Sequence, residues 1–189
     1  MKNILVTGQP GSGKTTLVQS IASRLQDLCP AGFYTAEIRT GGVRQGFELV
    51  SFSNERRILS HTTISGPHRV GKYGVDIRGF EEFCARLPLF VPPHLLIIID
   101  EIGKMECMSA HFRQTVERAL VSDTIFFATV ALRGDRFIKG VKRRSDIELV
   151  LVSPGNRDAL PDLIVPKIRK MVAERGSDSG SPSGKEEAD

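Results

Sequence analysis

The sequence predicts an α/β fold, a doubly wound and mostly parallel sheet with an inserted β-hairpin, for three reasons. Apolar runs with strand character alternate with segments that have helical spacing. The run at 95–99, Leu-Leu-Ile-Ile-Ile, shows no polar alternation, which is typical of a central parallel strand covered by helices on both faces. A glycine-rich stretch, 8–15, stands between the first apolar run and the first amphipathic segment, where an α/β sheet places a ligand.

The stretch 8–15 has the pattern G-x-x-x-x-G-K-T of a phosphate-binding loop. The glycines let backbone N–H groups turn inward around phosphate oxygens, and the following helix adds the positive end of its dipole. The lysine is expected to reach the β- and γ-phosphates, and the threonine hydroxyl to bind Mg²⁺. The residues of this loop are Gly8, Gln9, Pro10, Gly11, Ser12, Gly13, Lys14 and Thr15.

The first half of the chain combines this strand–loop–helix unit with a β-rich insertion. Glycines 41 and 42 predict the turn of the inserted hairpin, and the glycine-containing stretch 65–74 is expected to be irregular. The predicted elements are a strand at 2–7, a helix at 16–28, hairpin strands at 33–39 and 45–52, a short strand at 56–62 and a helix at 79–87.

The second half alternates strands and helices. The predicted elements are a strand at 95–99, a helix at 109–121, strands at 124–130 and 147–152 with a short basic helix at 137–144 between them, and a helix at 160–174 with Leu163 facing inward. We therefore expect one domain over residues 1–175. Residues 176–189 are rich in Gly, Ser and acidic side chains, which predicts a disordered acidic tail.

Charge and aromatic content favour a small polyanionic ligand. Without the last fourteen residues the chain has 25 basic and 18 acidic residues, a net charge of +7. Nucleic acid is the larger candidate partner, but the chain has no Trp and two Tyr, so it offers few stacking platforms for single strands. The composition therefore favours a nucleotide, and it makes no prediction of the oligomeric state.

The sequence also predicts a cytoplasmic protein without a membrane segment. Its longest apolar run, 95–99, is far too short to span a bilayer, and the N-terminus lacks the apolar region of a signal peptide. Cys29, Cys84 and Cys107 are odd in number and widely spaced, which predicts reduced thiols and neither a disulfide framework nor a zinc site.

Asp100 and Glu101 end the apolar strand and form the second candidate site. In isolation, two acidic residues at a strand end favour simple solvation. Beside a phosphate loop the preferred interpretation changes: Asp100 would hold Mg²⁺, directly or through water, and Glu101 would polarise the attacking water.

Five separated motifs in this chain resemble those of the small nucleoside-triphosphatase family of thermophilic archaea and bacteria, whose vertebrate relative is the cancer-related nucleoside-triphosphatase. The resemblance runs from about residue 3 to 169 and implies a RecA-like phosphate-loop fold. It also implies Mg²⁺-dependent hydrolysis of ATP, GTP, CTP, UTP and their deoxy forms to diphosphate and phosphate. The chain departs from the family at Ala36, where a second glutamate is frequent. The motifs are Gly32–Arg39, Gly46–Phe47, Arg69–Tyr73, Ile99–Glu106 and Asn156–Asp158.

The resemblance assigns residues 8–15 to the phosphates, with Thr16 as a further nucleotide-binding residue, Asp100 to the metal and Glu101 to the role of general base. It places Lys104 just past the strand, either at the γ-phosphate or as a solvated surface residue. Asn156 and Arg157 either flank the base or form a turn and helix cap. They do not form the N-K-x-D element of guanine-specific proteins, which favours broad base tolerance.

A cation is also expected at the leaving phosphate, because negative charge develops there in the transition state. Arg133 and Arg136 follow the strand at 124–130, and one of them is our candidate. The nearby run 142–144 is better explained as a solvated basic surface.

Two further functions remain open at the sequence level. A nucleotide or small-molecule kinase would carry the same phosphate loop, with the inserted hairpin holding an acceptor. A nucleic-acid-associated regulatory ATPase would account for the positive body of the chain.

Overall fold

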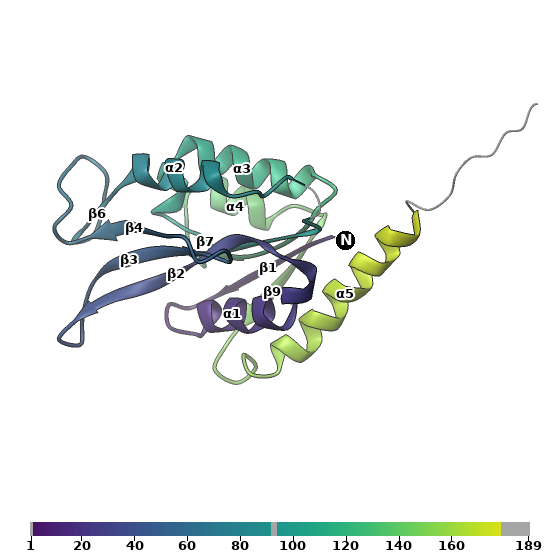
Figure 1. Cartoon of the computed structure of the whole chain (residues 1–189). Coiled ribbons are helices and arrows are strands. Elements are labelled where there is room, and N and C mark those ends of the chain that lie inside the picture. Colours follow the sequence, from purple (N-terminus) through teal and green to yellow (C-terminus); the bar gives the residue numbers. More distant parts are fainter. Residues whose placement is uncertain (1, 92–93, 179–189) are drawn as a thin grey trace, which may run out of the picture.

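The computed structural model describes residues 2–91 and 94–178. In this part of the chain, nine strands form one sheet in the order β5-β6-β4-β3-β2-β7-β8-β1-β9, with helices on both faces (Figure 1). The strands are β1 (Asn3–Gly8), β2 (Ala31–Thr40), β3 (Val43–Ser51), β4 (Arg56–His61), β5 (Arg69–Val70), β6 (Tyr73–Val75), β7 (Leu96–Ile102), β8 (Ile125–Val130) and β9 (Ile147–Val152).

The sheet has a parallel half, which carries the phosphate loop. Strands β2, β7, β8, β1 and β9 lie side by side, and each neighbouring pair is parallel. Their carboxyl ends therefore meet at one edge, where doubly wound sheets bind ligands. The α/β fold class expected from the sequence is confirmed, and β7 continues one position past the acidic pair to Ile102.

The other half is antiparallel and larger than the expected hairpin. Strand β3 returns along β2 through a turn whose glycines, at 41 and 42, have φ of 56° and 79°. Strands β4, β6 and β5 then extend this half outward. The expectation of irregular structure over 65–74 is wrong in part, because β5 and the start of β6 lie there as a short hairpin.

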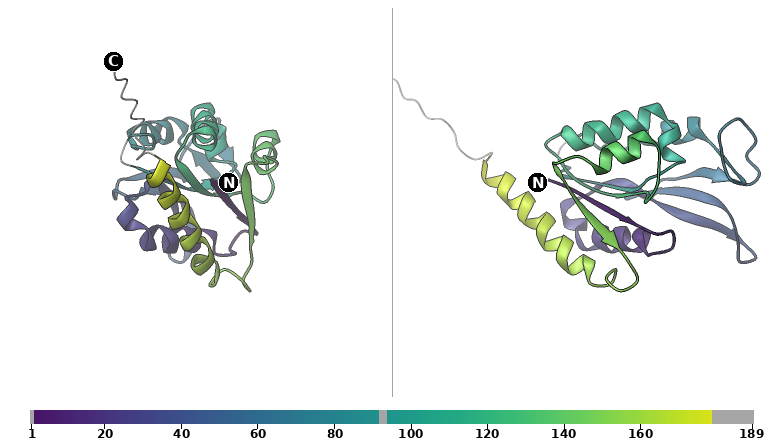
Figure 2. Two further views of the ribbon diagram at one scale, coloured as in Figure 1. Left: turned by 90° about the vertical axis from the view of Figure 1, so that its right-hand side faces the viewer. Right: turned by 180° about the vertical axis from the view of Figure 1, so that it is seen from behind.

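Two helical layers cover the sheet (Figures 1 and 2). Helices α1 (Lys14–Arg24) and α5 (Leu160–Asp178) pack on one face. Helices α2 (Ile77–Arg86), α3 (Ala110–Val121) and α4 (Arg136–Lys142) pack on the other. Short 3-10 turns, η1 (Gln26–Leu28) and η2 (Glu106–Met108), follow α1 and β7. No helix of the described residues is long and apolar enough to cross a bilayer.

Two expectations about α5 need correction. The helix continues to Asp178, past the domain boundary expected at residue 175, and the remainder of the expected tail, 179–189, lies outside the described residues. Leu163 does not face inward, because it is 65% exposed. Ile164 and Ile168 form the buried side of the helix, so the apolar stripe is narrower than the sequence indicated.

Each face of the sheet has its own apolar core. On the face covered by α2, α3 and α4, phenylalanine rings pack edge to face. The ring centroid of Phe33 on β2 lies 6.1 Å from that of Phe80 and 5.7 Å from that of Phe83, both on α2. Phe80 lies 5.1 Å from Phe112 on α3. These contacts pack β2 against α2 and pack α2 against α3, on the face of the sheet opposite α1.

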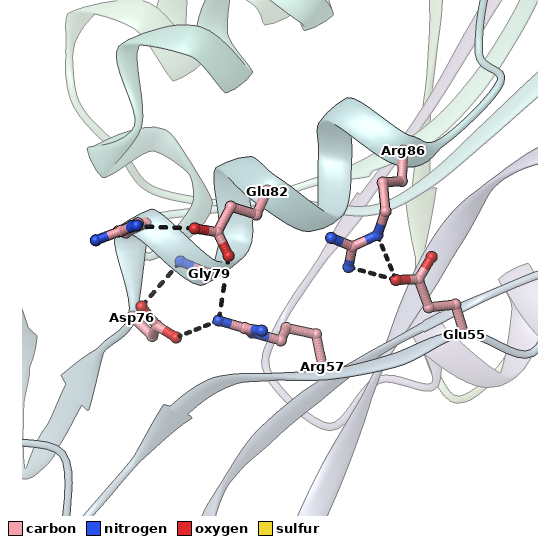
Figure 3. A network of polar contacts seen from close by, with 7 residues as sticks. Glu55, Arg57, Asp76, Gly79, Glu82 and Arg86 are labelled. Carbon is pink, nitrogen blue, oxygen red and sulfur yellow. Dashed lines mark hydrogen bonds and ion pairs between the residues drawn. The ribbon is translucent and has the colours of Figure 1, made fainter.

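Polar contacts attach the antiparallel half to α2 (Figure 3). The Arg57 guanidinium on β4 lies 3.4 Å from Asp76, which caps α2, and 3.6 Å from Glu82 on the helix itself. Arg86, the last residue of α2, donates a hydrogen bond from its Nε to Oε1 of Glu55, just before β4, at 2.7 Å. Because these pairs are half-exposed, we attribute to them the orientation of α2 rather than much stability.

Candidate active site

The phosphate loop joins β1 to α1 at the carboxyl edge of the sheet. Gly11 and Gly13 have φ of 76° and 94°, which glycine adopts without the strain that a side chain would cause. Gly13 is the N-cap of α1 and has the left-handed conformation. The Lys14 side chain is 9% exposed and folds back over the loop, where its Nζ donates to the carbonyls of Gly8 at 3.1 Å and Gln9 at 3.3 Å. The hydroxyl of Ser12 is buried without a partner in the described structure. The loop thus holds donors that phosphate oxygens would satisfy.

Asp100 lies at the centre of the site and is 1% exposed. Its Oδ2 accepts hydrogen bonds from the hydroxyls of Thr15 at 2.7 Å and Thr35 at 3.3 Å. Its Oδ1 accepts one from Thr129 at 2.6 Å. Thr35 and Thr129 come from β2 and β8, the two strands that flank β7, so the sheet itself orients this carboxylate.

The contact between Thr15 and Asp100 is suited to a hard divalent cation. It brings a hydroxyl and a carboxylate oxygen to one point beside the phosphate loop, and Mg²⁺ prefers such oxygen donors. Within the residues that the structure describes, no group of three or more His, Cys, Asp or Glu could hold a metal alone. A metal here would therefore need phosphate oxygens and water as further ligands, which is the usual arrangement for Mg²⁺.

Glu101 follows Asp100 on β7 and lines a cavity of about 530 Å³ together with Lys14. Burial raises the pKa of the Glu101 carboxyl, the charge of Lys14 lowers it, and Asp100 raises it further. A carboxylate with a raised pKa is a stronger base, so Glu101 is matched to proton abstraction.

The cavity has three walls. The phosphate loop forms the first, the segment 103–106 after β7 the second, and the segment 131–133 after β8 the third, with Phe47 and Val70 closing the antiparallel side. Lys104 and Arg133 both line it, whereas Arg136, which begins α4, is not among the described lining residues. Of the two candidate arginines, Arg133 is therefore the better placed.

The loop after β9 lies on the other side of the phosphate loop. The Asn156 side chain is used locally, accepting from the Ser153 N–H at 2.8 Å and donating to the Leu151 carbonyl at 2.9 Å. Arg157 instead packs over Gly13, where a Cβ would lie 2.9 Å from its Cδ. Thr16 and Arg157 line a hollow of about 310 Å³ here. Arg157 thus borders the phosphate loop, and Asn156 shapes the loop that carries it.

A larger hollow, about 750 Å³, lies between the second half of α1 and the start of β2. Its described lining includes Gln19, Tyr34 and His94 but none of the phosphate loop, Asp100 or Glu101. Because the phosphate donors and the acidic pair converge elsewhere, chemistry rather than size locates the site.

Comparison with known proteins agrees with this geometry. A model of an NTPase family matches residues 3–165. The chain belongs to this NTPase family. It is 40% identical over 158 residues to the nucleoside-triphosphatase THEP1 of Thermotoga maritima, covering 83% of this chain and 90% of that protein. It is 34% identical over 182 residues to the human cancer-related nucleoside-triphosphatase, covering 86% and 95%.

Two solved structures have the same fold as this NTPase chain. The crystal structure of THEP1 from Aquifex aeolicus matches with a TM-score of 0.76 at 32% identity, covering 88% of this chain and 98% of that one. The solution structure of a human cancer-related nucleoside triphosphatase matches with a TM-score of 0.77 at 32% identity, covering 90% and 98%. The family resemblance expected from the motifs is confirmed, and the chain is an enzyme of the nucleoside-triphosphatase class.

Three residues of the NTPase site received no role from the sequence. Thr35 and Thr129 hold Asp100, and Glu106 lines the cavity beside Glu101. A signal existed for Thr35 and Glu106, since both lie inside motifs of the family resemblance. Thr129 had none, because threonine is common in strands for its β-branched shape alone.

Proposed function

We propose that this NTPase hydrolyses the β–γ phosphoanhydride of ATP, GTP, CTP, UTP and their deoxy forms in a Mg²⁺-dependent reaction, releasing the nucleoside diphosphate and inorganic phosphate. The observation that carries the proposal is the 2.7 Å contact between Thr15 and Asp100, with Glu101 next in the strand at the cavity that Lys14 also lines. A cytoplasmic location, where nucleoside triphosphates are abundant, is part of the proposal.

Thr15 and Asp100 would hold the metal. Their oxygens provide hard ligands, and Mg²⁺ bound there would supply positive charge to the β- and γ-phosphate oxygens. Thr35 and Thr129 would keep Asp100 aimed at this point, because both hydroxyls already donate to its carboxylate.

Lys14 would exchange the carbonyls of Gly8 and Gln9 for phosphate oxygens when the nucleotide binds. Glu101 would accept a proton from a water molecule as the water oxygen forms its bond to the γ-phosphorus. The bond from that phosphorus to the β–γ bridging oxygen breaks, and the electron pair leaves with the diphosphate.

Positive charge for the transition state would come from the cavity wall. Arg133 and Lys104 line the cavity from the segments after β8 and β7, opposite the phosphate loop. We assign the main role to Arg133, with Arg136 as the alternative, because Arg133 is a lining residue.

Broad base tolerance follows from the character of the outer hollow. Gly13, Thr16 and Arg157 could flank a nucleoside, and the loop carries no N-K-x-D element to read guanine. The side-chain amide of Asn156, which could read a base, is already hydrogen-bonded within its own loop.

The test is phosphate release from a panel of the four ribonucleoside triphosphates and their deoxy forms, with Mg²⁺ and with a chelator. We expect release from every nucleotide, loss with the chelator, and a fall of at least about 100-fold for Lys14→Ala. Lys170→Ala is the matched control, since Lys170 lies on exposed α5 away from the site. Turnover of one base alone, or turnover unaffected by the chelator, would contradict the proposal.

A phosphotransferase is the second candidate, and the size of the cavity favours it. A volume of about 530 Å³ exceeds the need of one water molecule, and Phe47, Val70 and Met105 give it an apolar side suited to a small organic acceptor. Measuring the nucleoside diphosphate and inorganic phosphate in parallel separates the two reactions. Equal amounts indicate that water is the acceptor. An excess of nucleoside diphosphate over phosphate in the presence of an added acceptor indicates phosphoryl transfer to that acceptor.

A further inference from the structure

Glu106 is a buried carboxyl that the proposed hydrolysis does not use. It is the first residue of η2, is 6% exposed, and lines the same cavity as Glu101 and Lys14. Within the described residues no lysine, arginine or histidine forms an ion pair with it. A carboxylate buried without a cation is costly, so its presence at the cavity needs a reason.

The turn between β7 and η2 joins Glu106 to Glu101. A Cβ at Gly103 would lie 2.8 Å from Glu106 Oε2 and 3.4 Å from Glu101 Oε1. The Gly103 carbonyl accepts the Cys107 N–H at 3.0 Å, which closes the turn. Both carboxyl groups therefore lie on the side of Gly103 where a side chain would be, and Glu106 folds back towards the segment that directly follows the proposed base.

The surroundings of Glu106 disfavour a second negative charge. Burial raises its pKa to about 8, the charge of Glu101 adds to this, and Asp100 adds less, while the N–H groups of Glu106 and Gly103 oppose it. The other titratable groups that interact with Glu106 are thiols: burial raises the pKa of Cys107 to about 12 and also that of Cys84 on α2. Lys14, Lys104 and Arg133 line the same cavity, and Arg113 acts on the neighbouring Cys107 thiol, but within the described residues none of these cations forms an ion pair with Glu106.

We propose that Glu106 is a positioning residue for hydrolysis, whose buried carboxyl group supports the Gly103 turn beside Glu101. The inference rests on the proposed function, because it assigns Glu101 to proton abstraction. It has two consequences. Truncating the Glu106 side chain leaves Glu101 less well positioned and lowers kcat. Ionising Glu106 repels the γ-phosphate, so activity and nucleotide affinity both fall at alkaline pH.

The experiment compares the parent with Glu106→Gln and Glu106→Ala. Glutamine keeps the shape and cannot ionise, whereas alanine removes the support. We expect parental kcat/KM to fall about tenfold between pH 7 and pH 9, as a group with a pKa of about 8 loses its proton. Glu106→Gln should lack this fall and keep at least about a fifth of parental kcat at pH 7, while Glu106→Ala should lose about 20-fold or more in kcat with little change in KM.

Glu117→Gln on exposed α3 is the matched control, and it should keep the alkaline fall. An equal alkaline fall in the parent and Glu106→Gln, or full activity of Glu106→Ala, would overturn the inference. A second readout separates it from the proposed function: the Kd of a non-hydrolysable ATP analogue at pH 7 and pH 9. If the parent releases no phosphate, the proposed function fails. Equal pH dependence of this Kd in the parent and Glu106→Gln would still overturn the role of Glu106.

Discussion

Replacing Glu106 with glutamine should remove a loss of folding stability that develops as pH rises. The pKa of Glu106 is about 8 in the folded chain, against an ordinary value of 4.5. Between these values the folded chain binds more protons than the unfolded chain, so the free energy of unfolding falls with increasing pH. At 1.36 kcal/mol per pKa unit, this group alone should cost about 3 to 4 kcal/mol between pH 5 and pH 8, and about 0.4 kcal/mol more as the remaining half of the groups ionises above pH 8.

Urea unfolding of the parent and Glu106→Gln from pH 5 to pH 9 measures this contribution. Other groups titrate in both proteins, so the difference between the two curves isolates Glu106. From pH 5 to pH 8 the free energy of unfolding of Glu106→Gln should rise by about 3 kcal/mol relative to that of the parent, with equal m-values. The free energy of unfolding of Glu117→Gln should follow that of the parent. Parallel curves for the parent and Glu106→Gln would mean that Glu106 ionises in the folded chain as it does in water, which is the opposite of the expected result.

Three further substitutions test other parts of the structure. Gly32→Ala should lower the free energy of unfolding in urea by at least about 3 kcal/mol, because φ is +130° and a Cβ would lie 1.9 Å from a β7 carbonyl oxygen, whereas Gly140→Ala, with open space around it, should cost nothing. Thr129→Val removes a 2.6 Å hydrogen bond to Asp100 and should lower the free energy of unfolding in urea by about 2 kcal/mol. It should also raise the Mg²⁺ concentration needed for half-maximal activity, and an unchanged Mg²⁺ concentration would contradict the role of Thr129 in orienting Asp100. Arg157→Ala should weaken equilibrium nucleotide binding several-fold and equally for all four bases, and a base-selective effect would mean that it reads the base.

The sequence predicted the parts of the fold that local patterns determine. The loop 8–15 carries its own mechanism in its residue types, and the uninterrupted apolar run before Asp100 identified the central strand. From these two segments alone, the contact between Thr15 and Asp100 could be anticipated, because parallel strands bring their carboxyl ends to one edge.

The remaining features depend on tertiary contacts that no local pattern reveals. Strands β5 and β6 have two and three residues, too few for a period to appear, and they form because β4 offers an edge. The role of Thr129 arises only when β8 pairs with β7. Asn156 suited a base contact as well as a turn, and the loop geometry places both polar atoms of its amide in the turn.

The role of Glu101 as the base that activates water can be examined with a single variant. Glu101→Gln keeps the size of the side chain and removes its ability to accept the proton. We expect kcat for phosphate release to fall by about 100-fold or more, while the Kd for ATP with Mg²⁺ stays within about threefold of the parent. A Glu101→Gln protein that keeps more than about a tenth of parental kcat would contradict the claim and require another group to take the proton.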